Sequence, residues 1–169
     1  KRVESTVATA LGDGSPTGLT SSYGAFLLAQ LLVDRGRCAD VAPIADATAN
    51  LRDAGRARYR PEVLFFDAGC RLNAGKAGEA ADAFGKLLAE FPDSPRARAA
   101  AFYRFRALDV ARASDPKRPP QYEEALTAFV AKYPNDAAAG EARYQLGELR
   151  RAAGDCPKAE AEYVRVTAG

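Results

Sequence analysis

The stretch GKAGEAADAFGKLLAEFPDS, Gly75 to Ser94, decides how this chain is expected to fold. It predicts one helix that begins after a glycine turn and ends at Pro92, because proline lacks the N–H that a helix interior requires. Small and large apolar residues share one face of this helix: Ala80, Ala83, Phe84, Leu87, Leu88 and Phe91. A buried face with so many small residues predicts close packing against neighbouring helices of the same kind.

The pattern around Gly75 recurs along the chain. RGRCADVAPIAD around Gly36 and AAGDCPKAEAEY around Gly154 also follow a long apolar-periodic stretch and precede a shorter one. The first interval is 39 residues (75 minus 36), and the second is 79 (154 minus 75), close to two such units. A further turn is therefore expected midway, near residue 115, where the sequence reads SDPKRPPQ (114–121). Repetition at such a period is typical of solenoids.

Apolar residues recur at intervals of three and four between these turns, which predicts helices. Ser21 with Ser22, Pro61 with Glu62 and Ser94 with Pro95 are start signals, and Pro92 and Pro134 are stop signals. The expected pairs are 21–35 with 38–52, 61–73 with 77–91, 95–113 with 121–133, and 137–153 with 156–167. Four hairpins can form a closed bundle or an open solenoid, and the repeated turn favours the solenoid. We therefore expect an all-α fold, an α-solenoid of about four hairpins over residues 21–169, preceded by an N-terminal helix remnant and linker over residues 1–20.

Composition narrows the class of function. The 169 residues contain 24 Lys and Arg against 22 Asp and Glu, and a net charge of +2 is too balanced for a protein that wraps nucleic acid. Histidine is absent, so the usual general base near neutral pH and the commonest metal ligand are missing. GDGSPTG lacks the Lys and Ser/Thr ending of a phosphate-binding loop, and the adjacent Glu123 and Glu124 do not converge on a helix. We expect no catalytic site, no metal and no cofactor.

No window approaches about 18 consecutive apolar residues, so membrane insertion of this segment is not expected. Methionine is absent from the sequence, and the final EYVRVTAG breaks off where a helix can still continue. Both observations favour a processed form or an excised piece of a longer protein.

The three cysteines, Cys38, Cys70 and Cys156, show no ligand-like clustering, so zinc is not expected. Two interpretations remain. The favoured one is that they are buried small apolar side chains, as free cysteines usually are. The alternative is a disulfide between Cys38 and Cys70, which requires an oxidising compartment.

The fourth unit, EARYQLGELRRAAGDCPKAEAEYVRV, resembles a tetratricopeptide repeat. The resemblance is carried by the pair Leu146-Gly147, the turn glycine Gly154, the small Ala159 and the aromatic Tyr163. The opening stretch fits the same pattern through Gly75, Ala80, Phe84 and Pro92. The resemblance implies a right-handed superhelix of helix pairs, in which Ala80 and Ala159 are small because the two helices of a pair cross there, with axes about 8–10 Å apart.

Two departures limit the extent of the resemblance. Asp67-Ala68 stand where the second unit should have Leu-Gly, and the third unit has an extended first helix and a Pro-rich turn. The resemblance is therefore good over about residues 61–94 and 137–167 and only architectural elsewhere.

The segments AEFPDSPRARAAAFYR and AKYPNDAAAGEARYQLGE share an aromatic residue, Pro, Asp or Asn, a small residue and an Ala-rich helix with Tyr. This combination is similar to repeats of bacterial envelope proteins, the Tol-Pal coordination protein and the outer-membrane assembly lipoproteins, whose members act as periplasmic adaptors. It implies a bacterial protein that is periplasmic or outer-membrane-associated. A cytoplasmic location is the alternative.

Members of the resembled family line an inner, concave wall with the first helix of each pair. Carrying that pattern onto the matching helices selects Tyr23, Gln30, Asp34, Glu62, Phe66, Asn73, Arg96, Tyr103, Arg106, Glu141, Tyr144, Glu148 and Arg151. In a peptide groove, Arg96 and Arg106 are expected to pair with a carboxylate, and Tyr103 and Tyr144 to give rigid apolar contact. The alternative for any single residue is an ordinary solvated side chain, with the tyrosines packed between hairpins.

A second candidate surface is LRDAGRARYRPE, in which Arg52, Arg56, Arg58 and Arg60 surround Tyr59. Arginines with an aromatic residue can contact phosphates and bases. Neighbouring acidic residues dilute the charge, so a solvated helix end is the favoured interpretation.

Together these observations predict a noncatalytic scaffold that binds a protein or peptide partner through a concave groove, as in a cell-envelope adaptor. The alternative is a helical sensor or regulatory domain of a larger protein. No nucleic-acid partner is expected, and the sequence leaves the identity of the partner and the oligomeric state open.

Overall fold

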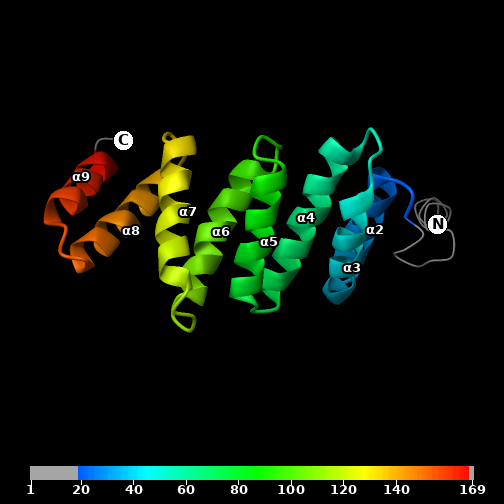
Figure 1. Ribbon diagram of the computed structural model, residues 1–169, viewed down its shortest axis with the longest axis horizontal. Helices are drawn as coiled ribbons and strands as arrows, with labels where there is room; N and C mark the ends of the chain where they lie inside the picture. Colours follow the sequence, from blue (N-terminus) through cyan, green and yellow to red (C-terminus); the bar gives the residue numbers. More distant parts are fainter. Residues whose placement is uncertain (1–18, 168–169) are drawn as a thin grey trace. The chain divides into compact units, whose positions relative to one another are not determined.

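The structure is a computed structural model that describes residues 19–167, so nearly all of the N-terminal helix remnant and linker predicted over residues 1–20 lies outside the described residues. Every regular element between residues 19 and 167 is a helix. The chain divides into two compact units, residues 1–100 and 101–169, and the division falls within helix α6 (Ala97–Ala111). The all-α class and the organisation in successive helix pairs, as in an α-solenoid, are thus confirmed (Figure 1).

Unit 1 contains two helix pairs. In chain order its elements are α2 (Ser22–Asp34), the 3-10 turn η2 (Cys38–Asp40), α3 (Val41–Ala47), the 3-10 turn η3 (Thr48–Asn50), α4 (Arg56–Asn73) and α5 (Ala77–Glu90). Helix α4 contacts α2, α3 and α5, and α2 also contacts α3 (Figure 1). The first helices of the two pairs, α2 and α4, are therefore neighbours.

Unit 2 repeats this organisation with most of α6, then α7 (Arg118–Lys132), α8 (Ala139–Ala152) and α9 (Cys156–Thr167). The buried rings of Phe105 in α6 and Phe129 in α7 have centroids 5.2 Å apart, which joins the first pair. Helix α8 contacts both α7 and α9, and Leu146 of α8 is fully buried. The helices of the unit therefore contact one another in chain order.

Three of the four pairs are closed by the same turn. Gly36, Gly75 and Gly154 adopt φ angles of 70°, 75° and 80°. After α4, the Gly75 N–H donates to the Leu72 carbonyl and the Lys76 N–H donates to the Arg71 carbonyl, both at 3.0 Å. This pattern ends a helix through a residue in the left-handed region, where glycine has no steric penalty.

The turn near residue 115 is present, but its chemistry differs. The Asp115 side chain accepts a hydrogen bond from the Lys117 N–H at 2.9 Å, and no residue of this turn has a positive φ. The turn between α6 and α7 therefore lacks the glycine that made the other three visible in the sequence.

Two predicted helix boundaries are wrong. Helix α4 begins at Arg56 rather than at Pro61, because Asp53 starts the helix earlier: its carbonyl accepts from the Arg56 N–H at 3.1 Å and its side chain from the Gly55 N–H at 3.2 Å. Pro61 consequently lies inside α4 and removes one helical hydrogen bond. The helix predicted over residues 38–52 is instead the short α3 flanked by η2 and η3.

Small residues lie where paired helices approach closely. Ala80 in α5 and Ala159 in α9 are buried. A Cβ atom added at Gly147 of α8 would lie 2.8 Å from Cδ1 of Tyr163 in α9, closer than atoms normally approach. The backbone of α8 thus packs directly against the Tyr163 ring, which a larger residue at position 147 would displace.

Candidate functional site

In unit 1, four aromatic side chains from the neighbouring first helices α2 and α4 form a continuous group. The ring centroids of Tyr23 and Tyr59 are 4.9 Å apart, and that of Phe26 lies 5.6 Å from Tyr59 and 6.1 Å from Phe66. Tyr23 is 48% exposed, and the other three rings are half-buried. We call Tyr23, Phe26, Tyr59 and Phe66 the aromatic cluster. Such rings offer contact area at low cost in side-chain entropy.

Helical spacing and one carboxylate position the aromatic cluster. Tyr23 and Phe26 are three residues apart and Tyr59 and Phe66 are seven apart, spacings that keep each pair on one helix face. The Ser22 hydroxyl donates to Oδ1 of Asp53 at 2.6 Å, which ties the start of α2 to the segment that begins α4. This hydrogen bond also holds the pKa of the Asp53 carboxyl below its ordinary value.

The other residues of unit 1 that were predicted to line the groove are either exposed or held in an ion pair. Gln30, Asp34 and Asn73 are exposed. Glu62 instead pairs with Arg96, with Nε and Oε2 2.7 Å apart, and the Arg96 guanidinium also lies over the Phe65 ring at 4.9 Å. A ligand carboxylate at Arg96 would therefore have to compete with Glu62.

In unit 2, exposed apolar side chains project from the first helices α6 and α8. Tyr103 and Val110 of α6 are 40% and 64% exposed, and Tyr144 of α8 is 50% exposed. Between the two helices, Arg106 of α6 forms an ion pair with Glu141 of α8. Arg106, like Arg96, already has a carboxylate partner, and here the pair bridges the two first helices of the unit.

The predicted residues at the other end of α8 form a polar group with α9. The Tyr163 hydroxyl donates to Oε1 of Glu148 at 2.6 Å, and Arg151 donates to Oε2 at 2.8 Å. The hydrogen bonds from Arg151 and Tyr163 hold the pKa of Glu148 below its ordinary value, while Glu148 raises the pKa of Tyr163. The Tyr144 ring lies 6.1 Å from that of Tyr163, so the structure brings Tyr144, Glu148 and Arg151 close to the same α9 side chain.

Large exposed apolar side chains are concentrated on the first helices. Among residues 19–167 they are Tyr23, Tyr103, Val110, Tyr144 and Val164. Only Val164 lies on a second helix, α9.

Phe26 and Tyr59 in the aromatic cluster of unit 1, and Val110 on α6 of unit 2, were not among the groove residues predicted from the sequence. Each could have been found from spacing, because Phe26 follows Tyr23 by three residues, Tyr59 precedes Phe66 by seven, and Val110 follows Tyr103 by seven. The contact between Tyr23 and Tyr59 had no such signal, since it depends on how α2 packs on α4.

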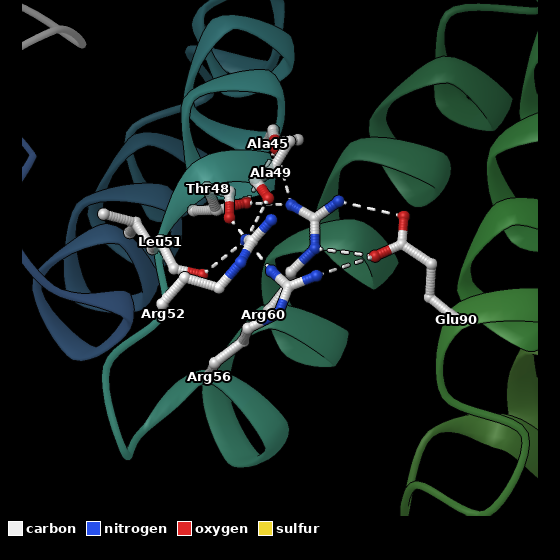
Figure 2. A network of polar contacts seen from close by, with 8 residues as sticks. All are labelled: Ala45, Thr48, Ala49, Leu51, Arg52, Arg56, Arg60 and Glu90. Carbon is white, nitrogen blue, oxygen red and sulfur yellow. Dashed lines mark hydrogen bonds and ion pairs between the residues drawn. The ribbon is translucent and has the colours of Figure 1, made fainter.

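The arginine run serves mainly a structural network, which Figure 2 shows. Arg60 of α4 is 1% exposed and binds Glu90 of α5 through two contacts, Nε to Oε2 at 2.9 Å and Nη2 to Oε1 at 3.0 Å. Its Nη1 donates to the Ala45 carbonyl at 3.0 Å and to the Thr48 hydroxyl. One guanidinium therefore connects α4 to α5 and to the end of α3.

Arg56 and Arg52 extend this network. Arg56 reaches Glu90 at 3.4 Å and the Thr48 carbonyl at 3.2 Å, and Arg52 donates to two carbonyls at the end of η3 (Figure 2). The interpretation of the run as a solvated helix end is thus wrong for Arg60, because it is buried. The four arginines do not form one exposed basic surface.

A disulfide joins Cys38 of η2 to Cys70 of α4, with the Cα atoms 5.2 Å apart. It connects the turn of the first helix pair to the first helix of the second pair. Cys156 is free and exposed at the start of α9. The favoured interpretation, three free and buried small apolar side chains, is therefore wrong: Cys38 and Cys70 are bonded to each other, and Cys156 is exposed.

A cleft of about 260 Å³ lies in unit 1 between α3, α4 and α5. Its charged lining residues include Arg71, which donates to two carboxylates: its Nε lies 3.1 Å from both Asp67 oxygens, and its Nη1 lies 2.9 Å from Glu79. Within residues 19–167, no group of three or more Cys, Asp or Glu side chains is placed to hold a metal ion. None of the helices in that range is long and apolar enough to cross a membrane.

Residues 68–94, the end of α4 with α5 and the turn after it, match the family model of the tetratricopeptide repeat. Comparison with curated proteins gives no match. The matched segment contains the sequence that predicted the fold, together with Gly75, Ala80 and Phe84. The match supports a relationship with the tetratricopeptide-repeat family, whose repeats generally mediate protein–protein interactions and are typically noncatalytic.

Proposed function

We propose that this chain is a noncatalytic scaffold that binds extended segments of partner proteins on the exposed faces of the first helices within each of its two units. The observation that carries the proposal is the position of the exposed apolar side chains Tyr23, Tyr103, Val110 and Tyr144, all on first helices. Leaving such side chains in water gives up the free energy of burying them, about 1.5–3 kcal/mol for a full side chain. A partner that covers them would recover part of that energy.

Polar groups on the same first helices suit an extended peptide. Gln30 and Asn73 are exposed amides on α2 and α4 that can bond to a peptide backbone. The Arg106–Glu141 and Glu148–Arg151 pairs of unit 2 are partly exposed and keep charges of both signs along the surface. A peptide with apolar anchors separated by polar residues would complement this arrangement.

The proposal is tested by selecting random peptides by display on the immobilised chain and measuring the affinity of the selected peptides by fluorescence anisotropy. Replacing Tyr23, Tyr103 or Tyr144 by alanine, one at a time, should lower the affinity for the peptides that contact that residue at least about tenfold. This is the usual effect of removing an aromatic hot spot. Val164→Ala is the matched control, because it removes an exposed apolar side chain from the second helix α9. Equal losses in the tyrosine variants and the control would refute the first-helix surface as the binding site.

We also propose that the chain works in an oxidising compartment, such as the periplasm of a bacterial envelope adaptor. The support is the Cys38–Cys70 disulfide, because such bonds persist outside the reducing cytosol. Alkylation of the protein in its native cells should label Cys156 without prior reduction, and Cys38 and Cys70 only after reduction. Labelling of all three cysteines without reduction would contradict this location.

A further inference from the structure

Arg58 occupies an unusual position beside the aromatic cluster. Its guanidinium lies over the ring of Tyr59, with Cζ 5.3 Å from the centroid, and the residue is exposed. Among residues 19–167, no carboxylate lies within ion-pair distance of it. Arg96, Arg106 and Arg151, by contrast, each pair with a carboxylate of their own unit.

The acidic residues nearest to Arg58 in sequence are committed elsewhere. Asp53 accepts hydrogen bonds from Ser22 and from the Gly55 N–H, and Glu62 pairs with Arg96. A guanidinium offers five N–H donors in a planar fork that suits a bidentate contact with a carboxylate. The aromatic cluster therefore lies next to a positive charge that the described part of the chain does not neutralise.

We propose that the aromatic cluster and Arg58 together bind a peptide segment in which an aspartate or glutamate lies next to an aromatic or large aliphatic residue. This inference rests on the proposed function and names the partner class for the part of the surface in unit 1. The acidic side chain pairs with Arg58, and its apolar neighbour contacts Tyr23 and Tyr59. Covering the rings excludes water near Arg58, and this strengthens the ion pair.

The structure favours a peptide over a nucleic acid as the source of the negative charge. Arg60 is buried against Glu90, Arg56 reaches the same carboxylate, and Arg52 donates to carbonyls of η3. Within the part of the chain that the structure describes, Arg58 is the one arginine of the run without such a partner, whereas nucleic-acid binding relies on many simultaneous phosphate contacts. A peptide with one carboxylate beside one apolar side chain matches the single positive charge of Arg58.

The test is an NMR titration of the isotopically labelled chain with three short Gly/Ser peptides that carry a central Asp-Phe, Asn-Phe or Lys-Phe step. The signals to follow are the Arg58 Nε–H and the rings of Tyr23 and Tyr59. The Asp-Phe peptide should bind about three- to tenfold more tightly than the Asn-Phe peptide. This ratio lies between the ratio expected for an exposed ion pair and that expected for a charge-assisted hydrogen bond. Added salt should reduce this difference.

Arg58→Gln should abolish the preference for Asp-Phe and leave binding of Asn-Phe unchanged. Arg52→Gln is the matched control, because it removes the same charge from the same run without touching the aromatic cluster, and it should keep the preference. Far-UV circular dichroism verifies that both variants fold.

Three results would overturn the inference. They are equal affinities for the Asp-Phe and Asn-Phe peptides, no shift of the Tyr23 or Tyr59 signals with any peptide, and tighter Arg58-dependent binding of a thymidine oligonucleotide than of the Asp-Phe peptide. In the first two cases the display experiment on the tyrosine variants still decides the proposed function separately.

Discussion

Glu90→Gln provides a direct test of the buried Arg60 network. Glu90 gives Arg60 two short contacts, at 2.9 and 3.0 Å, and glutamine keeps the shape of the side chain while removing the charge. The side-chain oxygen of glutamine can still accept one of these hydrogen bonds. The amide NH₂ group would face the second Arg60 N–H, and because both are donors that hydrogen bond is lost. Arg60 then remains buried with only the Ala45 carbonyl, the Thr48 hydroxyl and a single amide contact.

The magnitude follows from the exposure of the two side chains. Breaking a buried ion pair costs about 3–5 kcal/mol, because the remaining charge stays desolvated. Arg60 is 1% exposed but Glu90 is 28% exposed, so water screens part of the interaction. We therefore expect Glu90→Gln to lower the free energy of unfolding of unit 1 by about 2–4 kcal/mol.

Glu79→Gln is the matched control on the same helix. Glu79 also pairs with an arginine of α4, Arg71, at 2.9 Å, but its side chain is 51% exposed. An exposed pair of this kind contributes about 0–1 kcal/mol. A loss for Glu90→Gln no larger than that for Glu79→Gln would refute the reasoning.

The assay combines urea unfolding, followed by circular dichroism, with hydrogen–deuterium exchange of peptides from α3 and α5. Faster exchange is expected in those two helices, because Arg60 connects both to α4. The pKa of Glu90 is lowered by its hydrogen bonds with Arg60, so its stabilising effect is present above the ordinary value of 4.5 and is lost as the pH falls through the lower folded-state value. The wild type and Glu90→Gln should therefore converge in acid, and a difference that persists there would contradict the proposed origin.

Three further predictions follow from other contacts. Reducing the Cys38–Cys70 disulfide, which closes a sequence separation of 32 residues, should lower the free energy of unfolding by about 3–4 kcal/mol in chemical denaturation. Cys156→Ser should have little effect. An equal loss in the reduced protein and in Cys156→Ser would contradict a stabilising role of the disulfide. Gly147→Ala should lower the free energy of unfolding by about 1–3 kcal/mol, because the added Cβ displaces the Tyr163 ring. Gly140→Ala in the same helix meets open space and should raise the free energy of unfolding by about 0.5–1 kcal/mol. Melting temperatures that shift in the same direction for both variants would refute the contact. The pKa of Asp53 is lowered, so its contribution to stability is present above the ordinary value of 3.8 and is lost in more acidic solution. Asp53→Asn should therefore reduce the melting temperature at pH 7 more than at pH 2. An equal reduction at both pH values would exclude the carboxylate as the source of the effect.

Local signals in the sequence were sufficient for the helix pairs. Gly36, Gly75 and Gly154 marked three turns because a left-handed residue at a helix end is nearly always glycine, and all three have positive φ in the structure. The fourth turn was located only from the interval between the others, since Asp115 closes it without such a residue. Pro61 was misread as a helix start because the earlier start depends on the Asp53 side chain and carbonyl.

The candidate site was predictable only in outline. Periodicity predicted the first helices, and the pattern of the resembled tetratricopeptide repeats selected Tyr23, Phe66, Tyr103 and Tyr144 on them. It could not show that Tyr59 meets Tyr23, or that Arg96 and Arg106 already hold carboxylates, since these contacts join different segments of the chain.

The sequence by itself determined the all-helical class, the repeated turns and the small residues at the helix crossings, because each depends on neighbours within a few positions along the chain. The tertiary structure alone decided which charges are satisfied. In one run of four arginines it buries Arg60 against Glu90 and leaves Arg58 exposed over the half-buried ring of Tyr59. That difference arises because the carboxylate for Arg60 comes from another helix, 30 residues away, and its position is set by how the helices pack.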